Sequence, residues 1–222
     1  MKVEPIRDLK DIDRITDMLK SECTDERGRQ RLAMFIIGIE MGMRIGDMLH
    51  LRVGDLRGRE WYSYMPEKTD THISKKTGEQ MPGFKPKEVK IPISSQVRWM
   101  VEALYRGKPD DAYIFATDRD TRGRPSVHGH ISRKTASRDM RYIAKRAGLP
   151  YNVGCHTLRK TFGYQYYRKH RDVAMLQEWF QHSSSATTLI YIGVADDEKR
   201  YAVEHSPYRG ITKAEWADIG RT

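Results

Sequence analysis

Cysteine is scarce in this sequence: Cys23 and Cys155 are the two present in 222 residues. Two thiols are too few for a disulfide-stabilised secreted domain or for a zinc site built on thiolates. Long apolar runs are also missing, because the longest, at residues 32–39, is far shorter than the ~20 residues of a membrane-spanning helix. The amino terminus, MKVEPIRDLK, lacks the apolar stretch of a signal peptide. These absences predict a soluble, cytoplasmic protein without a membrane segment.

Acidic residues are outnumbered, with 30 Asp and Glu against 40 Lys and Arg, which gives a formal net charge of +10. An excess of this size favours a polyanionic partner such as nucleic acid. The hydrophobic content of 38% argues against wholesale disorder, and a chain of this length can bury roughly 70% of its unfolded surface. The composition therefore predicts a basic globular protein with a substantial core.

Sequence periodicity predicts a mainly α fold with a small antiparallel β-sheet, an α+β class. Apolar spacing typical of helices recurs in residues 11–19, 28–41, 45–51, 95–105, 131–147, 157–167, 172–180, 186–191 and 196–204. Patterns typical of strands occupy residues 61–65 and 88–93, with a third candidate at 71–76. No linker rich in Pro, Gly or Ser divides the chain. We therefore expect residues 1–222 to form one domain, with the sheet at about 60–93 and a C-terminal helix and tail at 195–222.

Glycine and tryptophan positions add two local expectations. Gly42 follows the apolar segment 28–41 and is expected to end that helix, as glycine commonly does. Trp99 and Trp179 fall on the apolar faces of their predicted helices. We therefore expect both indole rings to lie in the core.

Positive charge is concentrated in residues 119–146, which hold nine Lys and Arg against two Asp. Residues 122–124 read Arg-Gly-Arg in a predicted loop that leads into a basic helix, an arrangement suited to contacts with a phosphate backbone. The predicted DNA-binding side chains are Arg122, Arg124, Arg133, Lys134 and Arg138. A solvated charged helix face is the simpler alternative. His128 and His130 lie in the same basic loop without a carboxylate, so a loop or phosphate role is favoured over a metal site.

Four candidate positions for chemistry stand out: Arg44, the pair His156 and Arg159, His182, and Tyr191. The i, i+3 spacing of the pair places imidazole and guanidinium on one helix face. Each position alone has an ordinary structural explanation. Arg44 could pair with Asp47 between two helices, and an HxxR sequence is common by chance. His182 could stabilise a helix C-terminus, and Tyr191 could be one more core aromatic among twelve tyrosines.

Order and spacing together resemble the tyrosine recombinase (phage integrase) family. The stretches that carry the resemblance are MGMRIGDMLHLRVGDL, SKKTGE with VKIPIS, HTLRKTFGYQYY and FQHSSSATTLIYIG. They run in the family's order from residue 42 to residue 193, about two-thirds of the chain. The family's nine-residue step from the late histidine to the tyrosine is reproduced between His182 and Tyr191. The resemblance implies the fold of a tyrosine recombinase catalytic domain.

The resemblance also implies a site-specific recombinase or integrase that cleaves and rejoins DNA strands through a covalent 3′-phosphotyrosine. The catalytic residues carried over are Arg44, Lys76, His156, Arg159, His182 and Tyr191. Arginine forks suit a phosphodiester because they bind two oxygens and stay charged, and such donors stabilise the charge that develops during attack. His156 is expected to accept the proton of Tyr191, and His182 to hydrogen-bond a phosphate oxygen. No metal, cofactor or ATP is expected to take part.

The general acid is the assignment with a direct competitor. A mobile lysine can protonate the leaving 5′ oxygen, and in relatives this is the lysine before Thr-Gly in the second hairpin. That lysine corresponds here to Lys76 in the sequence KKTG. Lys68 in the sequence EKT matches the pattern almost as well, so both lysines stay candidates.

The resemblance has consequences for partners. Most family members carry an N-terminal helical DNA-binding domain, whereas here the catalytic-type helices begin almost at residue 1. We therefore expect that domain to be absent. An accessory DNA-binding protein is one possible source of the DNA contacts that the domain makes in relatives. Relatives also pack a C-terminal helix on a neighbouring subunit, which implies a homo-oligomer assembled on double-stranded DNA; a C-terminal helix that folds back on its own chain is the alternative. A noncatalytic DNA-binding regulator and a type IB topoisomerase-like enzyme that relaxes DNA are the alternatives.

Overall fold

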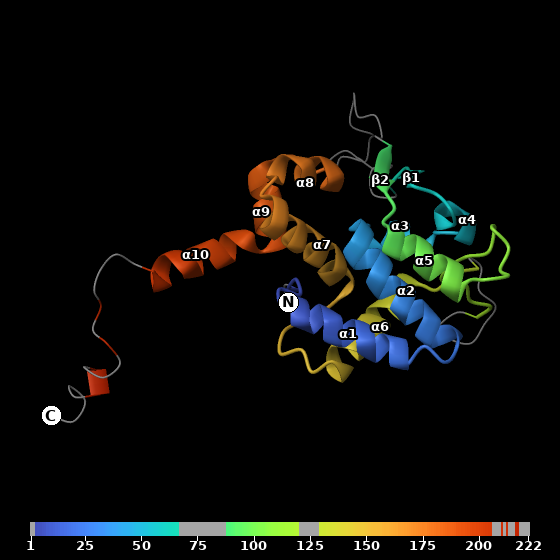
Figure 1. Cartoon of the computed structure of the whole chain (residues 1–222). Helices are drawn as coiled ribbons and strands as arrows, with labels where there is room; N and C mark the ends of the chain where they lie inside the picture. Colours follow the sequence, from blue (N-terminus) through green and yellow to red (C-terminus); the bar gives the residue numbers. More distant parts are fainter. Residues whose placement is uncertain are drawn as a thin grey trace, which may run out of the picture.

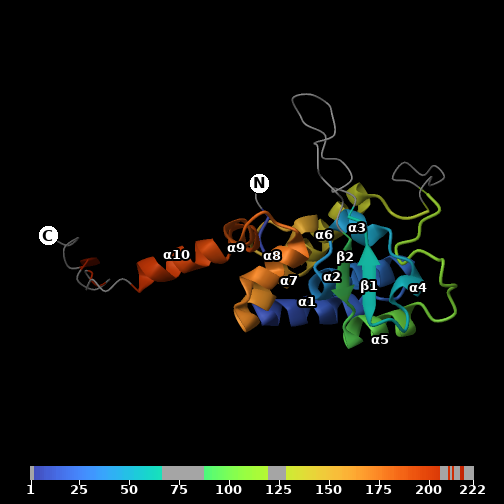
Figure 2. The same ribbon diagram turned by 90° about the horizontal axis from the view of Figure 1, so that it is seen from above.

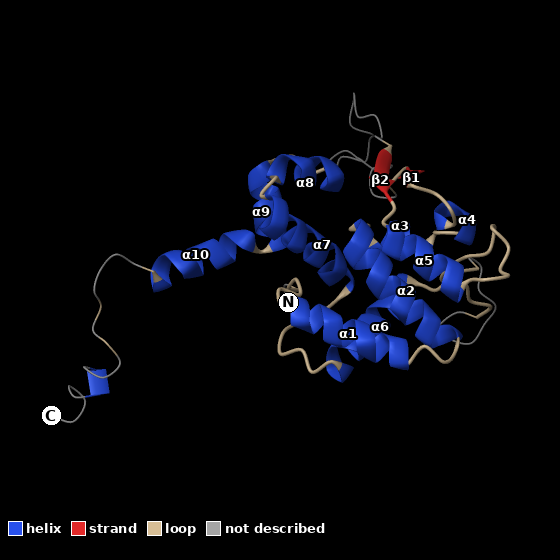
Figure 3. Cartoon of the chain, viewed as in Figure 1, coloured by secondary structure: helices blue, strands red, loops and turns tan. Residues whose placement is uncertain are grey.

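The computed structural model describes residues 3–66, 88–119 and 129–205, together with residues 210, 212, 216 and 217. Its helices are α1 (Leu9–Ser21), α2 (Glu26–Met41), α3 (Ile45–Leu49), α4 (Val53–Leu56), α5 (Ser95–Leu104), α6 (Arg133–Arg146), α7 (Cys155–His170), α8 (Val173–Phe180), α9 (Ser185–Ile192) and α10 (Val194–Glu204). Strands β1 (Trp61–Tyr64) and β2 (Val89–Pro92) form an antiparallel sheet. The predicted class, mainly α with a small antiparallel sheet, is confirmed (Figure 3).

Helix α2 lies at the centre of the structure and packs against α1, α3, α5 and α7 (Figure 1). Its buried apolar side chains point in several directions around the helix: Leu32, Ala33, Met34, Phe35, Ile37 and Met41. A helix that is apolar on most of its circumference is stable only when other elements enclose it. Helix α2 is therefore the support against which α7, the helix that carries the HxxR sequence, is held.

Gly42 ends α2, as predicted from the sequence. Its backbone adopts the left-handed conformation with φ of 62°, and its N–H donates to the carbonyl oxygen of Gly38. A Cβ atom at this position would lie 2.3 Å from Cδ1 of Phe162 on α7. Glycine therefore permits both the turn and the close approach of α7. The turn places Arg44 directly before α3.

The sheet matches the predicted strands, and its register pairs Trp61 with Pro92 and Tyr64 with Val89. Val89 and Ile91 are buried while Lys90 between them is exposed, as expected for a strand with one covered face. Helix α4 was not predicted, because four residues are too few for a helical period to be visible. The third strand candidate, residues 71–76, lies outside the described residues.

The expectation for Trp99 is wrong, because its side chain is 69% exposed. Helix α5 buries Val97 and Val101, which lie one turn apart. Trp99 follows Val97 by two positions, which turns it through about 200° to the opposite face. Trp179 packs as expected: it is partly buried, its ring centroid lies 4.8 Å from that of Phe162, and its indole N–H donates to the carbonyl oxygen of Met41.

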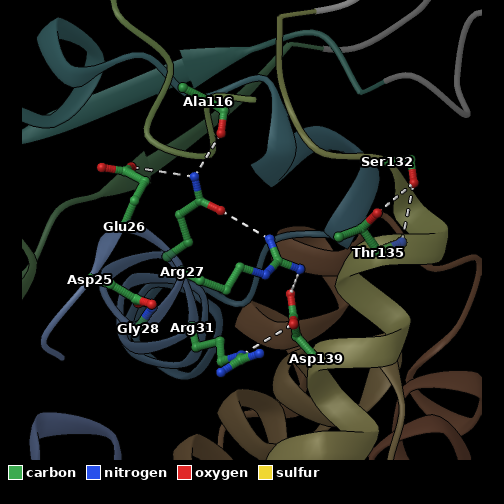
Figure 4. Close-up of polar contacts among 10 residues, drawn as sticks. Asp25, Glu26, Arg27, Gly28, Arg31, Ala116, Ser132, Thr135 and Asp139 are labelled. Carbon is green, nitrogen blue, oxygen red and sulfur yellow. Dashed lines mark hydrogen bonds and ion pairs between the residues drawn. The ribbon is translucent and has the colours of Figure 1, made fainter. Parts of the chain in front are cut away.

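Helix α6 is fixed to α2 through one buried carboxylate (Figure 4). Asp139 accepts hydrogen bonds from Arg27 and Arg31, and its side chain is only 4% exposed. Ser132 caps the helix by accepting from the N–H of Thr135. These contacts set the rotation of α6 about its axis. They leave the basic side chains of its other face exposed, namely Arg133, Lys134 and Arg138.

The apolar core has two parts. The larger surrounds α2, and the smaller joins α7, α8 and α9 through Phe162, Leu176, Phe180 and Ile192. Helix α10 continues from α9 and extends away from the other helices in both views (Figures 1 and 2). In the described part of the chain, no helix has the length and apolar character to cross a membrane.

Replacing Gly42 by alanine should destabilise the fold by about 2–4 kcal/mol, because the new methyl group adds a clash with Phe162 to the strain of a left-handed backbone. Gly58 is the matched control. It has φ of 64°, and among the described residues no atom lies within 4 Å of the place that a methyl group would take. Gly58→Ala should therefore cost only about 1 kcal/mol. Urea unfolding followed by circular dichroism measures both values, and equal losses would contradict the packing argument.

Candidate active site

Five of the sequence-predicted catalytic residues come together where α2, α7, α8 and α9 meet. Arg44 precedes α3, and His156 and Arg159 lie on α7. His182 lies in the turn between α8 and α9, and Tyr191 lies in the last turn of α9. The elements thus gather side chains that are separated by up to 147 positions in the chain. Lys76 and its competitor Lys68 lie outside the described residues.

Arg159 is held by backbone carbonyls from two different elements. Its Nη1 donates to Gly42 at 2.6 Å and its Nη2 donates to Phe180 at 3.1 Å. The side chain is buried, and its guanidinium carbon lies 4.1 Å from the centroid of the Phe180 ring. Burial, followed by repulsion from Arg44, lowers the pKa of Arg159 to about 10. The group is still a cation at neutral pH.

Arg44 shares an acceptor with Arg159, because its Nη2 donates to the same carbonyl oxygen of Phe180 at 3.3 Å. Gln181 follows Phe180 and adopts the left-handed conformation with φ of 51°, which is uncommon for a side chain larger than glycine. Within the described residues, neither guanidinium group forms an ion pair with a carboxylate. Two adjacent cations held by neutral carbonyls form a site suited to an anion with several oxygens.

Tyr191 lies against both the cations and a potential base. Its hydroxyl oxygen is 3.2 Å from Nδ1 of His156, a hydrogen-bond distance. Burial raises the pKa of Tyr191, while the nearby charges of Arg159 and Arg44 oppose that rise. The phenol therefore stays protonated in the free protein, and its reaction requires a proton acceptor. His156 is exposed, so an imidazole in hydrogen-bond contact with the phenol also has access to solvent.

His182 packs edge-on against Tyr191, with ring centroids 5.1 Å apart. Its Nδ1 is 3.1 Å from the hydroxyl of Thr188, and that hydroxyl is also within hydrogen-bond distance of the carbonyl oxygen of Ser184. A hydroxyl has one hydrogen to donate, so when Thr188 donates to Ser184 the Nδ1 of His182 carries the proton, and when Thr188 donates to His182 the proton is on Nε2. Burial, with added repulsion from Arg159 and Arg44, lowers the pKa of His182 to about 4. The imidazole is thus neutral at pH 7 in the free protein.

The structure adds three residues to the site that the sequence did not identify. Phe180 contributes a carbonyl oxygen, which no side-chain pattern reveals. Thr188 is fully buried and hydrogen-bonds His182. Lys160 places its Nζ 5.2 Å from the centroid of the Tyr191 ring. Its spacing of four from His156 puts both on one helix face, a signal that was available in the sequence.

The predicted DNA-binding residues divide into two groups. Arg133, Lys134 and Arg138 are exposed on α6, whereas Arg122 and Arg124 lie outside the described residues, as does His128. The ring of His130 lies 4.6 Å from that of His50. In the ranges that the structure describes, no three His, Cys, Asp or Glu side chains are grouped to hold a metal ion.

The sequence of the chain matches a known family and several of its members. The Phage integrase family matches residues 8–198. A probable integrase/recombinase, YoeC of Bacillus subtilis, is 30% identical over 200 residues, covering 90% of this chain and 94% of the relative. A tyrosine recombinase of Thermosipho africanus is 23% identical over 192 residues, covering 86% of this chain and 59% of the relative. The chain belongs to the phage integrase family.

Solved structures agree at the level of the fold. The catalytic domain of bacteriophage HP1 integrase aligns with a TM-score of 0.52 at 17% identity, covering 93% of this chain and 96% of that one. The XerH site-specific recombinase, in a post-cleavage complex with its palindromic difH substrate, aligns with a TM-score of 0.58 at 19% identity. That alignment covers 93% of this chain and 54% of XerH. The fold is therefore that of a tyrosine recombinase catalytic domain.

Removing the charge of Arg44 should raise the pKa of His182 from about 4 toward the usual value near 6.5, because one of the two repelling cations is lost. NMR titration of the imidazole protons, assigned with a His182→Gln variant, measures the change in Arg44→Met. Arg14→Met is the control, since Arg14 is exposed on α1 and pairs with Asp11. Burial and Arg159 still lower the pKa in Arg44→Met, so a partial rise is expected; a pKa of His182 that stays unchanged would contradict the repulsion by Arg44.

Proposed function

We propose that this chain is a site-specific DNA recombinase in which Tyr191 forms a covalent 3′-phosphotyrosine with a cleaved strand. The observation that carries the proposal is the contact of the Tyr191 hydroxyl with Nδ1 of His156, beside two guanidinium groups held by carbonyls. A nucleophile, a base and an anion site then lie within one small volume. This is the set of parts that transfer of a phosphoryl group to a side chain requires.

The chemical step conserves the number of phosphoester bonds. The Tyr191 oxygen attacks phosphorus, its proton passes to His156, and a tyrosyl–phosphorus bond replaces the bond to the 5′ oxygen. Arg44 and Arg159 bind the nonbridging oxygens, where negative charge increases in the transition state. The leaving 5′ oxygen takes a proton from a general acid, for which Lys76 is the candidate and Lys68 the competitor. Attack by a 5′ hydroxyl on the phosphotyrosine reverses the step, so rejoining needs no ATP.

His182 donates to a phosphate oxygen only when Nε2 carries a proton, in the neutral Nε2–H tautomer or in the imidazolium form. A phosphate oxygen only accepts hydrogen bonds, and neutral His182 carries one proton, on Nδ1 or on Nε2. Protonation of Nε2 turns the ring into a donor to the phosphate. The negative charge of a bound phosphodiester offsets the repulsion from Arg44 and Arg159 that keeps the pKa low. DNA binding therefore favours proton uptake at this residue.

The exposed face of α6 is proposed as part of the DNA-binding surface. Arg133, Lys134 and Arg138 lie on it, and Asp139 is turned inward. A cavity between the end of α3 and the start of α6 is lined by His50, His130, Arg133 and Lys134, among others. Such a run of cationic and imidazole side chains suits contacts with phosphates. The XerH relative, which shares this fold, is bound to DNA in its solved complex.

We also propose that the chain acts as a single catalytic domain in the cytoplasm, on double-stranded DNA. Helix α10 is proposed to contact a second copy of the chain, because Tyr201 and Val203 are 65% and 77% exposed on it and the helix extends away from the others (Figure 2). An accessory DNA-binding protein is proposed as a further partner. The role of residues 122 and 124 in DNA contact stays a prediction.

Tyr191→Phe should abolish covalent trapping on a nicked DNA substrate, since the phenyl ring has no oxygen to attack phosphorus, while DNA binding changes little. Denaturing gel electrophoresis of radiolabelled DNA measures trapping, and fluorescence anisotropy measures binding. Tyr151→Phe is the control, because the hydroxyl of Tyr151 has no hydrogen-bond partner among the described residues and lies outside the site. Trapping that survives in Tyr191→Phe would identify another nucleophile. Relaxation of supercoiled DNA without any sequence preference would instead select the topoisomerase-like alternative.

A further inference from the structure

Lys160 is a buried lysine next to the proposed nucleophile. Its side chain lies on α7 and the residue is only 6% exposed. Lysine is rarely buried to this degree, because removing an ammonium group from water is costly unless the charge is compensated. The Nζ atom lies 5.2 Å from the centroid of the Tyr191 ring, within the range of a cation–π contact.

Two side chains on one face of α7 contact Tyr191. His156 and Lys160 lie one helical turn apart, so their side chains project to the same side of the helix. His156 contacts the hydroxyl group, and Lys160 approaches the aromatic ring. The rings of Phe180 and His182 pack edge-on against Tyr191, with centroid distances of 5.7 Å and 5.1 Å. Beside the guanidinium groups of Arg44 and Arg159, Tyr191 thus contacts one ammonium group, two imidazoles and one phenyl ring.

Lys160 also connects Tyr191 to the amino-terminal segment, residues 3–7, which we call the N-terminal strap. Its Nζ donates to the carbonyl oxygen of Val3 at 3.0 Å. The strap is further tied to α7, because the N–H of Ile6 donates to Thr161 at 2.9 Å. Gln165 donates to the carbonyl oxygens of Ile6 and Arg7, at 3.0 Å and 2.9 Å. The strap thus runs along α7 directly behind the site.

The same strap contacts the junction between α9, which carries Tyr191, and α10. Arg7 forms an ion pair with Asp197 on α10 at 3.1 Å. Gly193, which joins α9 to α10 with φ of 84°, packs against the strap: a Cβ atom there would lie 3.2 Å from Nη2 of Arg7 and 3.6 Å from Pro5. The strap therefore touches the helix that carries His156 and the junction that follows Tyr191.

We propose that Lys160 is a positioning residue for the strand-transfer step, and that it makes the placement of Tyr191 depend on docking of the N-terminal strap. This inference rests on the proposed function of Tyr191. The ammonium group donates to the strap and presents its charge to the aromatic ring. When Tyr191 loses its proton the ring becomes an anion, and its attraction to the ammonium increases. The contact is then stronger in the transition state than in the ground state, which is the condition for accelerating a reaction.

Three substitutions separate the charge of Lys160 from its hydrogen bond. Lys160→Met removes both, Lys160→Gln keeps a donor to Val3 without charge, and Lys160→Arg keeps the charge. With saturating nicked DNA, covalent trapping should slow about tenfold in the Met and Gln variants, and the Arg variant should restore most of the rate. Lys169→Met is the matched control, since it removes one positive charge from an exposed position on the same helix.

A second measurement does not depend on DNA. The difference in tyrosinate absorbance between each protein and its Tyr191→Phe counterpart gives the pKa of Tyr191, which should be higher in Lys160→Met and Lys160→Gln than in Lys160→Arg. If the unsubstituted protein traps no DNA, the proposed function fails. If it traps DNA and the Met and Gln variants trap it equally fast with an unchanged Tyr191 pKa, the role of Lys160 fails alone.

The contribution of the strap is tested by Gln165→Leu, which removes two hydrogen bonds to the strap and leaves Lys160 in place. Gln165→Leu should slow covalent trapping when Lys160 is present. Added to Lys160→Met, it should slow trapping no further, because the strap acts through that lysine. Thermal unfolding of each variant verifies that it is folded at the assay temperature. Independent, multiplicative effects of the two substitutions would overturn the link between the strap and the nucleophile.

Discussion

The carbonyl oxygen of Phe180 is the acceptor on which the site depends, because it binds both guanidinium groups. It belongs to the last residue of α8, and the left-handed Gln181 that follows turns the chain toward His182. One backbone atom thus joins the end of α8, the residue before α3 and the middle of α7. Burial is the main cause of the lowered pKa of Arg159, and repulsion between the two cations around one neutral acceptor adds to it; burial and the same two cations also lower the pKa of His182. An anion bound between them relieves that repulsion.

The sequence predicted most of the helices and the five residues that meet at the site, because both leave periodic or ordered side-chain patterns. It did not predict contacts made by backbone atoms, since Gly42 and Phe180 act through carbonyl oxygens whatever their side chains. It failed for Trp99 because an apolar segment does not by itself tell which face of a helix is covered. Lys160 was missed because lysine is ordinarily a surface residue.

The two walls of the site rest on apolar clusters of different size. Arg159 is anchored to the end of α2, the helix enclosed by the larger apolar cluster. Tyr191 belongs to α9, which packs with α7 and α8 in the smaller cluster. The cationic wall is therefore built on the best-packed part of the structure, and the nucleophile on a smaller unit. Elements with less buried apolar area open at lower free energy, so local opening is expected first around α9.

The inward orientation of Asp139 has a consequence for the dependence of DNA affinity on ionic strength. Counterions are released only from phosphates that protein cations neutralise. Arg27 and Arg31 share the single negative charge of Asp139, which holds both guanidinium groups against α6, so neither is directed toward a duplex on the outer face. The side chains of Arg133, Lys134 and Arg138 lie on the exposed face of the same helix. Competition by salt is therefore expected to act mainly on the outer face of α6, and the slope of affinity against salt follows the cations that meet phosphates, not the formal charge of the chain.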